Sequence, residues 1–177
     1  MGERKRAQVW VETAIYSLIG LTIIAILLTT AMPQINKMKD KATISKATTS
    51  LNHFNNELNE ILQAPGSVRL IYFKLSKGTL TFDYENEKII YLLENTNLEL
   101  SEPGIEIPEG ELSLRTETYG KKFNIFLTLD YSENLNLTHG DETIKILQPG
   151  TTDYKIKAEN KGDAPIEGKI QIDLGVI

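Results

Sequence analysis

Four consecutive residues offer the clearest combination of side chains for chemistry, His139-Gly140-Asp141-Glu142. An imidazole beside two carboxylates is a set that transfers protons or binds divalent metals. The stretch is also polar, contains glycine and directly precedes the strand-like residues 143–147, as a surface turn does. We favour the turn over a metal or acid–base site.

A second acidic group lies around two prolines. Glu106, Glu109 and Glu111 follow one another closely, and Pro103 and Pro108 interrupt the same stretch. Glycoside hydrolysis needs two carboxylates held at a fixed separation in a cleft. Proline-interrupted polar stretches are more typical of loops. We therefore expect these glutamates to lie in a solvated loop.

The remaining composition excludes further chemistry. The chain has no cysteine, so disulfides, thiolate metal sites and cysteine nucleophiles are excluded. It has two histidines, His53 and His139, too few for a histidine-rich metal centre. The sequence contains no phosphate-binding loop, nucleophile elbow or zinc motif. These features favour a protein that is not an enzyme and that uses no metal or cofactor.

Charge is divided unevenly along the 177 residues. Residues 1–65 carry 7 basic and 5 acidic residues, a net charge of +2, and residues 66–177 carry 12 basic and 19 acidic residues, a net charge of −7. Nucleic-acid binding needs a basic face. The acidic second part therefore argues against a nucleic-acid partner.

The elements that position these residues begin with an apolar segment. Thr13 to Met32 is a run of twenty residues without a charge. As a helix it spans about 30 Å, the thickness of the hydrocarbon core of a bilayer. Trp10 and Tyr16 fit an interfacial position at one end. The segment is longer than the apolar part of a secretory signal peptide. A plain signal anchor and a pilin-type signal remain as alternatives.

The residues before the apolar run distinguish these two alternatives. A short basic leader ends in Arg4-Lys5-Arg6-Ala7, Gln8 follows, and Glu12 is the fifth residue after Ala7. This pattern resembles the class III signal peptides of archaeal type IV pilin-like proteins. The chain lacks both the Phe that commonly follows a Gly in bacterial type IV pilins and the Gly-rich apolar start of archaellins. The resemblance is therefore to an adhesion-type or minor pilin.

The resemblance implies a processing and assembly route. A prepilin peptidase would remove leader residues 1–7 by cutting between Ala7 and Gln8, and a membrane assembly platform would build the filament. The precursor would lie in the membrane with its N-terminus in the cytoplasm. The mature chain would polymerise with itself or related pilins into an extracellular filament. Glu12 would then pair with the α-amine of Gln8 in a neighbouring copy. In a plain anchor, Glu12 is instead a tolerated charge at the membrane edge.

The helical pattern continues beyond the apolar run. We expect one helix over residues 8–64, with 13–32 in the membrane or filament core and 35–64 amphipathic. Apolar residues recur at spacings of 3 and 4 on one narrow stripe: Ile44, Ala47, Leu51, Phe54, Leu58 and Ile61, extended upstream by Ile35, Met38 and Ala42. Pro33 is expected to bend the helix because it lacks an N–H. The stripe is expected to pack on the chain's own C-terminal domain, with a coiled coil as the alternative.

Residues 67–177 show the two-residue period of strands. The expected strands are 70–75, 80–84, 89–93, 97–101, 111–119, 122–130, 143–147, 152–159 and 166–174. Residues 160–163 are expected to form a turn. Short strands at even spacing predict an antiparallel β-sandwich, immunoglobulin-like or similar, and the whole chain is expected to be α+β. Asn136-Leu137-Thr138 is a possible glycosylation site at Asn136.

We therefore expect a structural subunit of a type IV pilus-like filament that assembles through its N-terminal helix and serves adhesion at the cell surface. The alternative is a single-span membrane protein whose outward β-sandwich binds a partner and never polymerises.

Overall fold

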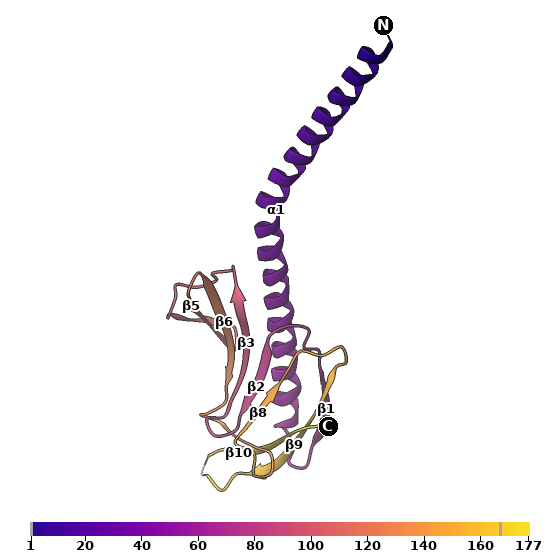
Figure 1. The fold of residues 1–177 in the computed structure, drawn as a ribbon. Helices are drawn as coiled ribbons and strands as arrows, with labels where there is room; N and C mark the ends of the chain where they lie inside the picture. The colour runs from indigo at the N-terminus through magenta and orange to yellow at the C-terminus, as the bar shows by residue number, and fades with distance from the viewer. Residues whose placement is uncertain (1, 167) are drawn as a thin grey trace. The chain divides into compact units, whose positions relative to one another are not determined.

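The computed structural model describes the backbone of residues 2–166 and 168–177 and the side chains of residues 9–166 and 168–177. A single long helix, α1 (Gly2–Ile61), precedes strands that form two sheets, so the predicted α+β class is confirmed (Figure 1). The chain divides into two compact units, residues 1–39 and residues 40–177. The described residues of the first unit are all helical, and the second unit contains the rest of α1 and all the described strands.

The strands of the second unit are short, as the two-residue periodicity predicts. Their bounds are β1 (Val68–Phe73), β2 (Thr79–Asp83), β3 (Lys88–Thr96), β4 (Glu106–Glu109), β5 (Leu112–Tyr119), β6 (Lys122–Asp130), β7 (Leu135–Thr138), β8 (Ile144–Leu147), β9 (Tyr154–Asp163) and β10 (Ile170–Val176).

The strands form a sandwich-like pair of sheets. One sheet has the order β1-β9-β10-β7, and the other has the order β4-β5-β6-β3-β2-β8. Every described strand pair is antiparallel except β7 with β10, which run parallel. The prediction of an antiparallel β domain therefore holds with one exception. Because β7 is reached from β6 in the other sheet, its direction is set by that crossover and not by a hairpin.

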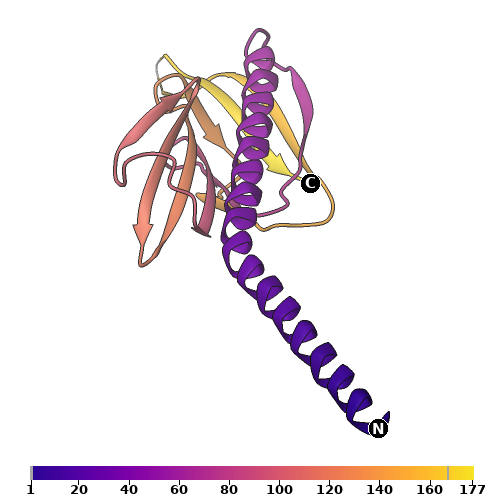
Figure 2. The same cartoon turned by 90° about the horizontal axis from the view of Figure 1, so that it is seen from above.

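Both sheets and the second half of α1 share one hydrophobic core. Alternate residues of the strands point into it, as in β3, where Ile89, Tyr91 and Leu93 are buried. The predicted stripe of α1 from Ile44 to Ile61 is buried in the same core. The ribbon shows this part of the helix running along the strands (Figures 1 and 2). Packing of the stripe on the chain's own β domain is thus confirmed, and a coiled coil is not needed to bury it.

The observed helix departs from the predicted one at both ends of the stripe. It ends at Ile61, three residues before the predicted residue 64, and turns follow. Upstream, Ile35, Met38 and Ala42 are exposed and do not extend the buried stripe. The buried residue at that level of the helix is Asp40, a charged residue that an apolar pattern does not detect.

Several strand assignments also need correction. Residues 97–101 are not a strand. Asn95 adopts a positive φ of 55° at a register shift in the β3–β6 pair, and β3 ends at Thr96. Side chains then satisfy the backbone donors of Leu98 and Ser101. The expected loop at 106–109 is the edge strand β4, where a proline is tolerated. β7 was not predicted. Residues 160–163 continue β9 instead of forming a turn. They pair with β10, with a register shift between Gln171 and Ile172.

Candidate functional site

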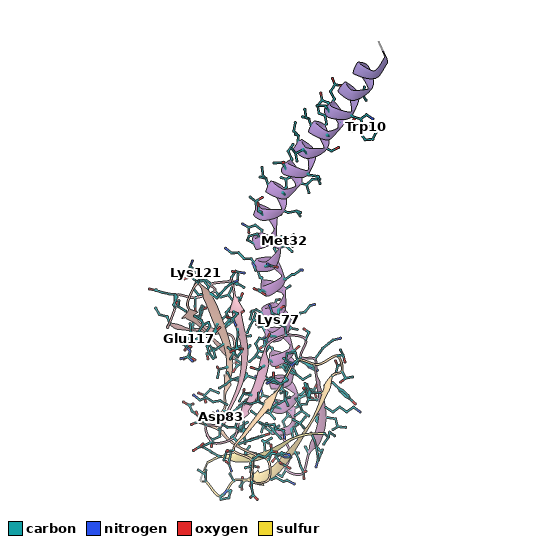
Figure 3. The ribbon with its side chains drawn as sticks, in the orientation of Figure 1. Trp10, Met32, Lys77, Asp83, Glu117 and Lys121 are labelled. Carbon is teal, nitrogen blue, oxygen red and sulfur yellow. The ribbon has the colours of Figure 1, made fainter. Side chains whose placement is uncertain are left out.

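The most unusual surface of the chain is the segment Val9–Met32 of α1, here called the exposed apolar segment. Its large hydrophobic side chains are exposed on all sides, including Trp10 at 78% and Leu18 at 67% (Figure 3). The helix is long and apolar enough to cross a membrane. Soluble proteins rarely expose contiguous apolar surface of this extent. By length and composition, the segment fits a membrane-spanning helix.

The threonine hydroxyl groups of this segment are compatible with an apolar environment. Thr13 and Thr22 each donate a hydrogen bond from Oγ1 to the carbonyl four residues earlier, at 2.9 Å and 2.7 Å. Thr29 and Thr30 donate to carbonyls of the preceding turn in the same way. In lipid, every polar group must be satisfied within the protein. These threonines meet that condition inside the single helix.

The predicted assembly residues lie at the start of this segment. Glu12 is an exposed residue of α1. The side chains of Ala7 and Gln8, the predicted cleavage pair, lie outside the described residues. Pro33 lies inside α1, one residue beyond the segment, and supplies no N–H to the carbonyl of Thr29. The bend at Pro33 stays a prediction, because it concerns how the two units lie relative to each other.

The second unit begins with a buried polar cluster on α1. Asp40 is only 6% exposed, and two segments of the β domain contact it. Lys77 Nζ donates to Asp40 Oδ1 at 2.6 Å, and Thr96 Oγ1 donates to Asp40 Oδ2 at 2.6 Å. Figure 3 shows Lys77 beside the helix. Lys77 precedes β2 and Thr96 ends β3, so this carboxylate attaches the helix to two separate chain segments.

The electrostatics of Asp40 favour its charged form. Burial by itself raises the pKa of this carboxyl group, but the hydrogen bonds from Lys77 and Thr96, the charge of Lys77 and a backbone hydrogen bond from Asn97 outweigh burial. The pKa of Asp40 therefore lies below its usual value. A buried carboxylate that stays ionised needs partners of this kind.

Two further polar contacts hold the helix in the β domain. Tyr131 donates from its hydroxyl to Oδ1 of Asn55 at 2.9 Å, and both residues are buried. Asn160 Nδ2 donates to the carbonyl of Ile61 at 3.0 Å, which satisfies an acceptor at the end of the helix. The helix is therefore fixed at its last turn and midway along the stripe, as well as at Asp40.

The stretch 139–142 forms the predicted polar turn. Glu142 N donates to the carbonyl of His139 at 3.0 Å, and the Glu142 carboxylate pairs with Lys145 at 3.0 Å. His139 Nδ1 lies 3.2 Å from Asp173 Oδ1 on β10, a partner that the sequence did not suggest. Among the described residues, no group of three or more histidines and carboxylates is arranged to hold a metal ion.

The predicted glycosylation site lies on an edge strand. Asn136 is a half-buried residue of β7, on the opposite face from the buried Leu135 and Leu137. The hydroxyl of Thr138, the third residue of the motif, lies 3.5 Å from the carbonyl oxygen of Ile172. Modification of Asn136 stays a prediction.

Sequence reasoning missed the Asp40 cluster, although a signal for it was present. Asp40 lies four residues before Ile44 and seven before Ala47, so it continues the buried stripe by one turn. A charged residue on the core-facing side of a helix indicates a buried partner.

Comparison with protein-family models, curated proteins and solved structures finds no match to this chain.

Proposed function

We propose that this chain is a structural subunit of an extracellular type IV pilus-like filament that assembles through its N-terminal helix and serves adhesion. The observation that supports this is a division within one helix. The stripe residues between 44 and 61 of α1 are buried in the chain's own β domain, whereas the large hydrophobic side chains of the exposed apolar segment are exposed. A single subunit therefore combines an exposed apolar helix segment with a folded β domain.

An apolar segment of this kind suits two successive environments. It is apolar on every side and thus compatible with lipid before assembly. The same surface packs against identical helices in a filament core, where van der Waals contact replaces lipid contact. The β domain then remains outside the core and forms the filament surface. This arrangement needs no catalytic group.

Glu12 is the residue that we assign to setting the register between neighbours. After cleavage, the α-amine of Gln8 is a cation four residues before Glu12, about 6 Å along a helix axis. Two parallel helices that place the amine of one beside Glu12 of the other are therefore offset by about 6 Å or less. A buried carboxylate is costly unless paired, so other offsets are disfavoured.

The proposed partners follow from this route. A prepilin peptidase cuts between Ala7 and Gln8, a membrane assembly platform adds subunits, and copies of the chain or related pilins form the polymer. The precursor lies in the membrane with its N-terminus in the cytoplasm, and the mature protein lies at the cell surface.

The first test is the N-terminal residue of the protein recovered from its native membrane or cell surface, measured by mass spectrometry. The proposal expects a chain that begins at Gln8. An intact Met1 or Gly2 would instead support the single-span protein that does not polymerise. A start beyond Met32 would indicate a secreted β domain and would contradict both.

The second test replaces Glu12 by Gln, with Thr13→Ala as a neighbouring control. Glu12→Gln keeps the size of the side chain and removes its charge, so we expect membrane insertion to persist while surface filaments decrease at least tenfold. Thr13→Ala should leave both unchanged. Normal filaments from the Glu12→Gln variant would refute the assigned register role.

A further inference from the structure

The acidic side chains of the β domain are concentrated in residues 94–111, here called the acidic segment. It contains Glu94, Glu99, Glu102, Glu106, Glu109 and Glu111 and no lysine or arginine. All six are exposed, and none has an ion-pair partner among the described residues. Arg115, which faces Glu106 across the β4–β5 pair, is ion-paired with Glu117, and Lys41 lines a groove together with Glu109. The segment itself carries an excess of negative charge.

A groove of opposite character lies between α1 and the loop after β1. It has a volume of about 450 Å³ and is lined by Ser45, Lys46, Thr49, Ser50, Lys74 and Ser76, here called the basic groove. No carboxylate lines it. Lys46 and Lys74 have no ion-pair partner among the described residues. Two ammonium groups and several hydroxyl donors suit carboxylate ligands.

The acidic segment of the same chain lies on the other side of the helix. A second groove, of about 360 Å³, is lined by Ser45 and Thr49 together with Ile107 and Glu109. Because Ser45 and Thr49 line both grooves, these turns of α1 separate the basic groove from the acidic segment. Glu109 of the same chain lines the groove on the other side of these turns. We therefore take the carboxylate that enters the basic groove to come from another copy.

The edge strand of the acidic segment favours contact through side chains. β4 is the edge of its sheet, all four of its residues are exposed, and Pro108 lacks the N–H that strand addition would use. Glutamates on such an edge also discourage backbone pairing with another strand. The surface is thus suited to electrostatic docking and not to β-augmentation.

We propose that the acidic segment of one copy docks into the basic groove of the next copy along the filament. The inference rests on the proposed function and adds its second interface, between β domains. The two surfaces are different patches of one chain, so the contact is heterologous and propagates from copy to copy instead of closing a two-fold dimer. Such a contact fits an open polymer and adds specificity to the less selective packing of apolar helices.

The test uses the absence of native cysteine. The full chain carrying Ser76→Cys and Glu109→Cys is displayed on cells and treated with a short bis-maleimide. The proposal expects a ladder of dimers, trimers and larger species on a denaturing gel. Each single-cysteine variant should give no cross-linked product, because the facing surface of the next copy carries no cysteine. Ser76→Cys with Glu133→Cys, which lies outside the acidic segment, is the control and should give no ladder.

Charge reversal provides an independent readout. Lys46→Glu with Lys74→Glu should decrease subunits in filaments at least tenfold, and adding Glu106→Lys with Glu109→Lys should restore them. Lys155→Glu, a reversal at another exposed and unpaired lysine, should have no effect. Tyrosine circular dichroism in the near ultraviolet confirms that each variant is folded.

The outcomes separate this inference from the function on which it rests. Filaments that form from Gln8-initiated chains, give no ladder and resist charge reversal would overturn the inference and leave the filament proposal intact. Dimers from a single-cysteine variant would indicate a two-fold contact and also overturn it. A third result would also overturn the inference. In it, no ladder forms, and heparin, an anionic polysaccharide, binds the wild-type chain but not the Lys46→Glu, Lys74→Glu variant. An uncleaved chain without filaments would contradict both proposals.

Discussion

Asp40 provides the most direct test of how α1 is held in the β domain. Replacing Asp40 by Ala removes the acceptor of the side-chain hydrogen bonds from Lys77 and Thr96 and of the backbone hydrogen bond from Asn97. Thr96 is fully buried, so its hydroxyl group loses its partner without gaining water. An unsatisfied buried hydroxyl costs about 1–3 kcal/mol.

Lys77 contributes less to the expected loss. Its side chain is 51% exposed, so water hydrates the ammonium group once Asp40 is removed. A pair of this kind contributes about 1 kcal/mol or less. The free energy of unfolding should therefore fall by about 1–4 kcal/mol in Asp40→Ala. Asp40→Asn keeps an acceptor for Thr96 and should cost only about 1 kcal/mol.

The pH dependence follows from the direction of the pKa shift. The folded-state pKa of Asp40 lies below its unfolded value, which is near 4. Its contribution to stability is therefore fully present above about pH 4 and is lost as the pH falls through the folded-state pKa. The difference in stability between the wild-type chain and Asp40→Asn should shrink as the pH is lowered from 7 to 3.

Urea unfolding of the full chain in detergent micelles measures these quantities. The only tryptophan, Trp10, lies outside the second unit, so near-ultraviolet circular dichroism of the tyrosines is the suitable signal. Lys155→Ala, at an exposed and unpaired lysine, should change stability by less than about 0.5 kcal/mol. A loss below about 0.5 kcal/mol in Asp40→Ala, or a difference that grows at low pH, would refute the reasoning.

Three other substitutions test the packing in the same unfolding assay. Phe54→Ala removes a buried ring of the helix stripe and should cost about 3–5 kcal/mol, and a loss under about 1 kcal/mol would show that the stripe is not in the core. Asn160→Ala leaves the carbonyl of Ile61 without its donor and should cost about 1–3 kcal/mol, with faster amide exchange in the last turn of α1. Gly78→Ala places a Cβ 2.5 Å from the carbonyl oxygen of Leu92, at a φ of 79°, and should cost about 1–3 kcal/mol; an unchanged midpoint would contradict this close approach.

Much of the helix was predictable because its signals are local. The uncharged run from Thr13 to Met32 and the buried stripe from Ile44 to Ile61 both follow from residue spacing, since a helix places residues three and four apart on one face. The change to a two-residue period after Gly66 indicated strands for the same reason. Each of these patterns depends only on neighbours in the chain.

The edge strands were harder to predict because their residues lack a buried face. All four residues of β4 are exposed, so no alternation distinguishes Glu106–Glu109 from a loop. β7 is only four residues long, and its parallel pairing with β10 joins residues more than thirty positions apart. Short edge strands carry too little pattern to be recognised without their partners.

The sequence by itself determined that this chain has an apolar helix segment, an amphipathic helix segment after it and a strand-rich domain. Hydrophobic periodicity predicts these elements because it depends only on residues that are close in the chain. Only the tertiary structure decided which groups meet. Asp40 finds Lys77 and Thr96 at separations of 37 and 56 residues, and it is buried because those partners are there. The same holds for the basic groove, where serines and lysines of α1 and of the loop after β1 come together. Such pairings depend on how distant segments pack, and no local pattern encodes that.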